Sequence, residues 1–465
     1  MVTDERAVGV ADPRPPEDLA ALAPGLWPRG AARSTAGSLT LGGLDVRDLA
    51  AEFGTPAYLL DEDDFRARAR GHRLAFEDAF ADVGGADVYY AGKAFLCTAL
   101  AQWVREEGLR LDVCTGGELA VAVRAGTPGE QIGLHGNNKS PAEIEAALRH
   151  GVGRIVLDSL EEIERVAEAA TRLDVVAPVM LRITVGVSAH THEFIATAHE
   201  DQKFGFSLAG GAAAEAVTRV LGHTDRLRLL GLHSHIGSQI FDVSGFEVAA
   251  RRLLGLHASV ARDHGVELPE LDLGGGFGIA DTSDEDPLPT AELARSLATI
   301  VREECAGAGV RVPRISVEPG RSIVGPGTVT LYEVGTVKPV QLEGGRTRTY
   351  VAVDGGMSDN IRPALYGADY SSALANRTGS AGPMLVRVVG KHCESGDIVV
   401  RDGYLPDDVR AGDLVAVPAT GAYCRSLANQ YNHVPRPPVV AIRGGRARVV
   451  VRRETVDDLL ALDVP

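Results

Sequence analysis

The sequence lacks paired cysteines, a recognisable signal peptide and any apolar run long enough to span a bilayer. Its five cysteines are widely scattered with no Cys-x-x-Cys pair, and an odd number of them is typical of reduced thiols in a reducing compartment. The amino terminus has Asp4, Glu5 and Arg6 without an apolar stretch behind them. We therefore expect neither secretion nor membrane insertion, and we predict a cytoplasmic protein.

Positive charge is also in short supply. The 47 basic residues are outnumbered by 63 acidic ones, which gives a net charge of −16. Such a surface repels the phosphate backbone of nucleic acids and anionic lipid headgroups, so neither is expected as a partner. The chain does have length and apolar content, because 465 residues with 45% hydrophobic composition are enough for a large core and two domains.

The stretch from Pro13 to Arg33 is rich in Pro and Ala and has little periodicity. This composition predicts a flexible amino-terminal extension over residues 1–35. No chemistry is assigned to it.

From about residue 61, short apolar runs alternate with longer segments of helical periodicity. Eight runs have the length and composition of buried strands, at 88–90, 111–113, 132–134, 155–157, 179–183, 229–232, 271–273 and 315–317. The intervening segments space their apolar residues as amphipathic helices do, as in 94–107, 141–150 and 246–264. Eight parallel strands with crossover helices predict an α/β fold, a (β/α)8 TIM-type barrel over residues 62–326.

Polar and glycine-rich turns follow almost every one of these runs. In such barrels the loops after the carboxyl ends of the strands hold the chemistry, so these turns are expected to share one rim. The turns contain Lys93 and the segments 112–118, 135–138, 158–159, 233–235, 274–276 and 318–321.

Beyond Gly325 the helical periodicity fades, and β-rich runs alternate with Gly and Pro turns. This texture predicts a second, antiparallel β domain over residues 327–465. Residues 39–60, which precede the barrel, are expected to add edge strands to it. The predicted second domain is therefore 36–61 plus 327–465.

Four motifs lie in order along the barrel, and three more follow it. The barrel motifs are Tyr90 to Phe95 (YAGKAF), Leu232 to Ser238 (LHSHIGS), Gly274 to Gly278 (GGGFG) and Glu318 to Arg321 (EPGR). Their order and spacing resemble the fold-type III pyridoxal-phosphate-dependent decarboxylases, whose barrel and second β domain are also those of alanine racemase and ornithine decarboxylase. The later motifs narrow the resemblance to the diaminopimelate decarboxylase family, and they are Val353 to Tyr366, Cys393 to Asp397 and Gly421 to Tyr423.

The resemblance implies an activity and an assembly. The reaction is the pyridoxal 5'-phosphate-dependent decarboxylation of meso-2,6-diaminopimelate to L-lysine and carbon dioxide, the last step of lysine biosynthesis. The assembly is a homodimer with shared active sites, in which each chain supplies Lys93 to one site and Cys393 to the other. A protonated thiol at Cys393 would donate the proton that replaces carbon dioxide.

The resemblance also implies which residues hold the cofactor. Lys93 would bind it covalently, because burial beside Tyr89, Tyr90 and Phe95 would disfavour the charged form of its amine. Glu318 would keep the pyridine nitrogen protonated, and His235 would stack on the ring. The remaining cofactor-binding residues would be Asp112, Ser238, Gly275, Gly276, Gly320, Arg321 and Tyr423, most of them around the phosphate.

The substrate's distal end would be recognised by charge. Arg321, Arg362 and Tyr366 would hold the distal carboxylate, since a guanidinium binds a planar anion through two hydrogen bonds. Glu394 would hold the distal ammonium group, and Tyr423 would also contact the substrate. A substrate without that carboxylate would leave buried arginines unpaired and would be rejected.

Plainer interpretations exist for each of these residues. Lys93 would otherwise be a surface charge, the glycines an ordinary turn, Cys393 a packing thiol and Glu318 an ion-pair partner of Arg321. Asp112 and Glu118 are as well explained by structural salt bridges as by support of the cofactor. His233 and His235 form a His-x-His pair, which some barrel hydrolases use to bind zinc, but the eighth strand ends in Glu-Pro-Gly rather than in a metal-binding aspartate, so no metal is expected.

Other activities of the same fold also remain open. A decarboxylase acting on arginine, ornithine or a carboxylated polyamine should lack the motif that contains Arg362 and Tyr366. A non-catalytic homologue that still binds the cofactor should have lost Lys93 or Cys393. An alanine racemase would use a tyrosine as its second base where this chain has Cys393.

Overall fold

The computed structural model describes residues 14–186, 203–342, 345 and 347–464, and these form two compact units. The barrel unit contains Asp64–Ile279 and Glu285–Gly325. The sheet unit contains the described residues of Met1–Asp63, Ala280–Asp284 and Pro326–Pro465. None of the described helices is both long and apolar enough to cross a membrane.

Eight strands of the barrel unit close into a ring, which confirms the predicted barrel. Every neighbouring pair is parallel, and the last strand pairs with the first, Val317 lying opposite Val88. A short ninth strand, β10 (Phe206–Ser207), pairs with the ring from outside the closed order. In ring order the strands are β5 (Ala86–Ala91), β6 (Arg110–Val113), β7 (Ile132–Leu134), β8 (Arg154–Leu157), β9 (Ala177–Thr184), β11 (Leu227–His233), β12 (Glu270–Asp272) and β13 (Arg314–Val317).

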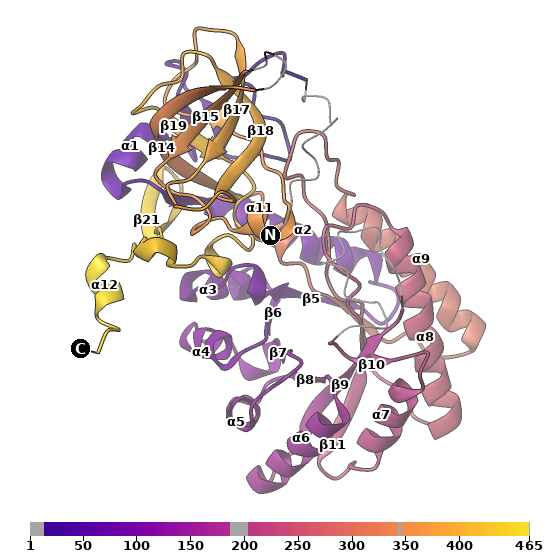
Figure 1. The fold of residues 1–465 in the computed structure, drawn as a ribbon. Coiled ribbons are helices and arrows are strands. Elements are labelled where there is room, and N and C mark those ends of the chain that lie inside the picture. Colours follow the sequence, from indigo (N-terminus) through magenta and orange to yellow (C-terminus); the bar gives the residue numbers. More distant parts are fainter. Residues whose placement is uncertain (1–13, 187–202, 343–344, 346, 465) are drawn as a thin grey trace. The chain divides into compact units, whose positions relative to one another are not determined.

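Helices alternate with these strands and lie outside them (Figure 1). In α6 the buried residues recur at helical spacing, and the Ser159 hydroxyl caps its first turn by accepting from the backbone N–H of Glu162. The helices are α2 (Glu62–Ala79), α3 (Thr98–Glu106), α4 (Gly116–Arg124), α5 (Pro141–His150), α6 (Leu160–Leu173), α7 (Ala212–Leu221), α8 (Ser244–His264), α9 (Thr290–Ala308) and α10 (Arg321–Val324), with 3-10 turns at Gly92–Ala94 and Gly129–Gln131.

The sheet unit is built on a second, mainly antiparallel sheet. Its strands are β14 (Thr328–Gln341), β15 (Thr347–Val353), β16 (Ala373–Leu374), β17 (Pro383–Val389), β18 (Ile398–Pro406), β19 (Leu414–Val417), β20 (Val439–Arg443), β21 (Arg446–Val451) and β4 (Ala57–Asp61). The helical elements of this unit are α1 (Val46–Phe53), α11 (Arg362–Tyr366) and α12 (Val456–Leu460), with 3-10 turns at Arg425–Leu427 and Tyr431–His433. Two strand pairs, β15 with β17 and β4 with β20, are parallel.

Strand β4 lies inside this sheet and not at its edge, which differs from the prediction for residues 39–60. It pairs with β14 on one side and β20 on the other, and all five of its residues are buried. A continuous apolar run is typical of a strand covered on both faces. The run Ala57 to Leu60 is continuously apolar, but it is too short to distinguish a central strand from an edge strand by sequence alone.

Part of the segment predicted as an extension has regular structure. Leu26 and Trp27 are buried, and β1 (Ala31–Arg33) pairs with β2 (Leu39–Leu41), which pairs with β3 (Leu44–Asp45). The guanidinium of Arg33 donates to the backbone oxygen of Leu374 at 2.8 Å. The described residues of this segment are therefore tied to the sheet unit from at least Leu26.

Candidate active site

Lys93 lies in the 3-10 turn that ends β5, and its side chain is exposed. This differs from the buried environment expected from its aromatic neighbours. Tyr89 and Tyr90 are adjacent in a strand and point to opposite faces, so they cannot both surround the next turn. Tyr89 lies under the guanidinium of Arg154, whereas the Tyr90 hydroxyl donates to the backbone oxygen of Phe95 at 2.8 Å.

Close packing joins the Lys93 turn to the turn after β13. A Cβ atom on Gly320 would lie 2.9 Å from the backbone oxygen of Ala91 and 3.0 Å from the Cβ of Ala94. Only glycine fits there. Ala91 and Ala94, on either side of Lys93 in the chain, therefore lie against the predicted phosphate-binding residue Gly320.

The glycine turn after β12 requires glycine for two separate reasons. Gly274 and Gly276 have φ of 72° and 110°, in the left-handed region that other residues avoid. A Cβ on Gly275 would lie 2.2 Å from the backbone oxygen of Glu318. The Gly275 N–H donates to Nδ1 of His235 at 3.2 Å, so this turn, the His235 segment and the turn after β13 are in contact.

Two more predicted residues of this region meet directly. Nη2 of Arg321 donates to the hydroxyl of Ser238 at 2.9 Å, and Arg321 is buried. Burial lowers the pKa of His235 well below its usual range, and the positive charge of Lys93 adds to that effect. Lys93, His235, Ser238 and Arg321 thus belong to one rim, as predicted from the strand ends.

Glu318 is buried among basic groups at the centre of this rim. Its Oε1 atom lies 3.2 Å from Nε2 of His135, 3.3 Å from Nε2 of His233 and 3.5 Å from Nη2 of Arg154. The second carboxylate of the group, Asp112, lies 2.7 Å from the same nitrogen of His135. These residues come from five different strands or strand ends.

This arrangement divides the protons between the two carboxyl groups and the imidazole. Burial lowers the pKa of His135, but the carboxylates of Asp112 and Glu318 outweigh it and raise that pKa to about 9. Burial alone would raise the pKa of Glu318, whereas His135 and His233 bring it well below its usual range. Burial, followed by the charge of Glu318, raises the pKa of Asp112. Glu318 is therefore held as a carboxylate.

The structure changes the set of residues that could bind zinc, because His135 joins His233 in it and His235 does not. His135, His233 and Glu318 place one ligand atom each within 4.8 Å of one another, but His235, the second member of the His-x-His pair, donates no ligand to that group and faces Gly275. The raised pKa of His135 favours a proton on it rather than a metal ion. His190, His192 and His199 lie outside the described residues.

The supporting acidic residues now have partners. Asp112 pairs with His135, as described above. Glu118, at the start of α4, accepts from the backbone N–H of Cys114 at 2.7 Å and so fixes the turn after β6. Burial and the Glu118 carboxylate raise the pKa of the Cys114 thiol to about 12. Glu118 therefore shapes the turn.

These residues fit pyridoxal phosphate on two observations of the structure. A buried carboxylate held in its charged form by two imidazoles and a guanidinium is the hydrogen-bond acceptor that a protonated pyridine nitrogen needs. A turn in which side chains would collide with backbone leaves its N–H groups open to close approach by an anion. Both features lie on the rim that holds Lys93.

In the sheet unit, the predicted substrate-binding residues begin on the short helix α11. Arg362 is buried and forms an ion pair with Asp281, 3.3 Å between Nη2 and Oδ2, and it also donates to the hydroxyl of Tyr370. Tyr366, at the other end of α11, is half-buried. A guanidinium has five N–H donors, so Asp281 and Tyr370 do not exhaust those of Arg362.

Cys393 lies in an exposed turn of the sheet unit and is not a packing thiol. The turn is built on Asp397, a buried carboxylate that accepts from the backbone N–H of His392 at 2.8 Å and of Met357 at 2.6 Å. Glu394 is exposed beside Cys393. The turn between β17 and β18 therefore presents the thiol of Cys393 and the carboxylate of Glu394 to solvent.

Tyr423 has φ of 63°, which is an outlier for a bulky residue. Residues held in this region cluster at active sites and ligand-binding segments. The side chain of Tyr423 is half-buried.

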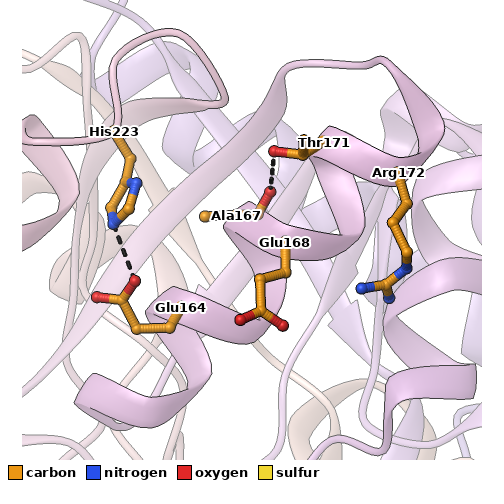
Figure 2. Close-up of a pocket in the computed structure, with 6 residues that line it drawn as sticks. All are labelled: Glu164, Ala167, Glu168, Thr171, Arg172 and His223. Carbon is orange, nitrogen blue, oxygen red and sulfur yellow. Dashed lines mark hydrogen bonds and ion pairs between the residues drawn. The ribbon is translucent and has the colours of Figure 1, made fainter.

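One surface cavity of the barrel unit is unrelated to this rim. It lies over α6 and the end of α7, with a volume of about 360 Å³, and is lined by Glu164, Ala167, Glu168, Thr171, Arg172 and His223 (Figure 2). Two of its polar side chains pair with each other, since His223 lies 3.0 Å from Glu164. None of the predicted site residues lines it.

Three residues of the charged group around Glu318 were not predicted as site residues from the sequence. His135 was noted only as part of a turn, His233 only as half of a possible zinc site, and Arg154 was left out of its strand because it is polar. A polar residue at the start of a barrel strand is a signal that could have found Arg154. Nothing local marks His135, because its partners come from distant segments.

Comparison with known proteins agrees with these observations. Residues 67–325 match the family model described as the pyridoxal binding domain of pyridoxal-dependent decarboxylases. That segment holds every strand of the barrel.

Curated relatives match nearly the whole chain. Diaminopimelate decarboxylase of Mycobacterium tuberculosis is 58% identical over 451 residues, 96% of this chain and 99% of the relative. The enzyme of that name from Bacillus subtilis is 47% identical over 430 residues, 92% and 96% of the two chains. Among solved structures, diaminopimelate decarboxylase from M. jannaschii in complex with L-lysine superposes with a TM-score of 0.87, at 30% identity, over 94% of this chain and 98% of that one.

Proposed function

The chain belongs to the diaminopimelate decarboxylase family of pyridoxal-dependent decarboxylases, and from that membership we propose that it converts meso-2,6-diaminopimelate to L-lysine and carbon dioxide. The observation that carries the proposal is the rim of the barrel unit, where Lys93, the glycine turn and the charged carboxylate of Glu318 lie together. The reaction is the last step of lysine biosynthesis. The alternative is a decarboxylase of another basic amino acid.

The cofactor in this proposal is pyridoxal 5'-phosphate. When bound, it supplies an electron-withdrawing ring that accepts the electron pair left behind as the substrate carboxylate departs. Lys93 would hold it through its amine, His235 would cover the ring face, and Glu318 would keep the ring nitrogen protonated. The phosphate would be held by the backbone of Gly275, Gly276 and Gly320 and by Ser238, Arg321 and Tyr423.

Glu318 acts here through its charge. Its ionised form is stabilised by His135 and His233, so it can accept a hydrogen bond from a protonated nitrogen without losing its own charge. A ring nitrogen kept protonated by Glu318 would let the cofactor accept the electron pair that the departing carboxylate leaves behind. Asp112 takes part through its ion pair with His135.

Cys393 is the proposed proton donor to the carbon that loses carbon dioxide. Its exposed position in the turn built on Asp397 leaves the thiol open to approach. Glu394 is the proposed partner of the substrate's distal ammonium group. Arg321, Arg362 and Tyr366 are the proposed contacts of the distal carboxylate, which distinguishes diaminopimelate from lysine and ornithine, and Tyr423 is a further proposed contact of the substrate.

A homodimer with two shared sites is also part of the proposal, with Cys393 and Glu394 supplied by the second subunit. Such a dimer has a simple test. Mixing inactive Lys93→Ala chains with inactive Cys393→Ala chains should restore activity, because one site of each mixed dimer would be intact. No recovery after subunit exchange, with mixed dimers demonstrated by mass, would contradict sharing.

The test of the proposed function combines chemistry and specificity. Borohydride reduction of the purified protein, followed by digestion, should place the mass of reduced pyridoxal phosphate on the peptide containing Lys93. Meso-diaminopimelate should release carbon dioxide, whereas ornithine, arginine and lysine should not. Lys93→Ala should abolish both results, and Lys338→Ala, an exposed lysine of β14, should change neither. Release of carbon dioxide from ornithine but not from diaminopimelate would favour the alternative.

A further inference from the structure

His135 lies between two carboxylates at the end of β7. Its Nε2 atom is 2.7 Å from Oδ1 of Asp112 and 3.2 Å from Oε1 of Glu318. Asp112 comes from β6 and Glu318 from the segment after β13, so one ring nitrogen joins acidic groups of two separate strands. All three side chains are about nine-tenths buried or more.

The loop that holds His135 is itself fixed by a buried lysine. Nζ of Lys139 donates to the backbone oxygen of Gly136 at 2.7 Å and to that of Val156 at 2.6 Å. The same ammonium group pairs with Glu162 at 3.1 Å. The loop after β7 is therefore tied to β8 and α6, which fixes the backbone next to His135.

The remaining charged neighbours set the balance around this nitrogen. His233 from β11 packs edge-on against His135, with 4.9 Å between ring centroids, and Arg154 from β8 lies 3.5 Å from Glu318. Asp272 from β12 pairs with Arg154 at 2.5 Å, and the charge of Arg154 also acts on Asp112. Arg182 from β9 adds positive charge acting on both carboxylates of the pair.

We propose that His135 is a positioning residue: as an imidazolium between Asp112 and Glu318, it holds the Glu318 carboxylate ionised and aimed for the ring nitrogen of the cofactor. This inference rests on the proposed function, because it assigns a role toward the same group. His135 does not touch the reacting atoms. It acts through Glu318.

The reason lies in the two carboxylates. Two buried carboxylates that face one nitrogen repel each other, and in a neutral surrounding one of them would bind a proton. A positive charge between them lets both stay ionised. With a neutral residue at 135, Asp112 and Glu318 would share a proton, and the contact of Glu318 with the ring nitrogen would weaken.

The test uses the full-length holoenzyme and His135→Gln, which keeps a hydrogen-bond donor and removes the positive charge. The variant should lose bound pyridoxal phosphate about tenfold faster on dialysis, which corresponds to binding weakened by about 1.4 kcal/mol. Its visible cofactor absorption should change, and kcat should fall while KM for the substrate stays within about twofold. His257→Gln, at a buried histidine of α8, is the matched control and should retain the cofactor as the wild type does.

A measurement on the unaltered protein keeps the inference testable if His135→Gln does not fold. Because the pKa of His135 is raised to about 9, cofactor loss from the wild type should accelerate as the pH rises through that value. A flat profile from about pH 7.5 to 10, or a His135→Gln holoenzyme with wild-type retention and spectrum, overturns the inference. A wild-type protein that binds no pyridoxal phosphate, or binds it and does not decarboxylate diaminopimelate, is a different result and rejects the proposed function instead.

Discussion

Arg154 and Asp272 form an ion pair inside the barrel, with 2.5 Å between Nη2 and Oδ2. Their side chains are 1% and 0% exposed. The Ser316 hydroxyl joins the pair, donating to Asp272 at 2.6 Å and accepting from Nη1 of Arg154 at 2.8 Å, and the guanidinium lies 3.6 Å above the centroid of Tyr89. Asp272 also accepts from the N–H of Gly274 at 2.7 Å, so the pair links the barrel interior to the glycine turn.

The first prediction concerns this pair. Asp272→Asn should lower the free energy of unfolding of the barrel unit by about 3–5 kcal/mol, because it removes the carboxylate that lies closest to a buried guanidinium. Urea denaturation followed by Trp103 fluorescence, in a Trp27→Phe background, measures it on this unit alone. Asp82→Asn, which breaks the exposed pair with Arg302, should cost at most about 1 kcal/mol. Equal losses in the two variants would show that burial of the Arg154 pair is unimportant.

The second prediction concerns acid stability. His72 is buried, its Nε2 contacts the hydroxyl of Ser322 at 3.0 Å, and burial lowers its pKa to about 4 from 6.5. Between these values the unfolded chain binds a proton that the folded chain does not, so stability is complete above about pH 6.5 and is lost as the pH falls through about 4.

His72→Gln should therefore reduce the pH dependence of unfolding in that window by about one proton. Urea midpoints at about pH 4.5, 5.5 and 7, converted to free energies, provide the comparison with the wild type. An unchanged slope in His72→Gln would mean that this histidine does not link folding to protons.

Much of the barrel could be predicted from the sequence, because each strand contains a short apolar run. Each predicted run lies within the observed strand or extends one residue beyond it. The rim followed from the same runs, since a residue after a parallel strand can only lie at the carboxyl end. The environment of Lys93 was predicted wrongly as buried, because neighbours in sequence were treated as neighbours in space. Strand alternation separates Tyr89 from Tyr90, and the 3-10 turn leaves Lys93 exposed.

The charged centre of the site could not be predicted in this way. His135, Arg154 and Glu318 come from separate strands or strand ends. Only closure of the ring brings His135 and Arg154 within 4 Å of the Glu318 carboxylate. Arg154 looked like the polar flank of an apolar run. Its partners Asp272 and Ser316 are equally ordinary in sequence, and the pairing depends on the register of β8, β12 and β13 around the barrel.

The third prediction concerns the proton donor. Cys393→Ala should lower kcat by about 10²- to 10⁴-fold, the usual contribution of a positioned general acid, and leave cofactor binding intact. Steady-state kinetics together with the cofactor absorption of the purified variant measure both. Cys305→Ala, at a buried thiol of α9, should stay within about threefold of the wild type. Wild-type turnover in Cys393→Ala would remove this residue from the mechanism.

The last prediction concerns recognition of the substrate's distal carboxylate. Arg362 is held by Asp281 and Tyr370 in a fixed orientation, so its guanidinium can offer two parallel donors to an anion, which an ammonium group cannot. Arg362→Lys should therefore lower kcat/KM for meso-diaminopimelate by at least about a hundredfold, and cofactor retention should not change.

The matched control for that variant is Arg377→Lys. Arg377 also pairs with carboxylates of the sheet unit, Asp408 and Asp413, but no role toward the substrate is proposed for it. Its substitution should lower stability by about 1 kcal/mol and leave kcat/KM unchanged. If both variants lose activity in proportion to their stability, Arg362 supports the fold only. If Arg362→Lys alone loses activity and discriminates less between diaminopimelate and lysine, the guanidinium binds the distal carboxylate. A purely structural role would not alter the preference between two substrates.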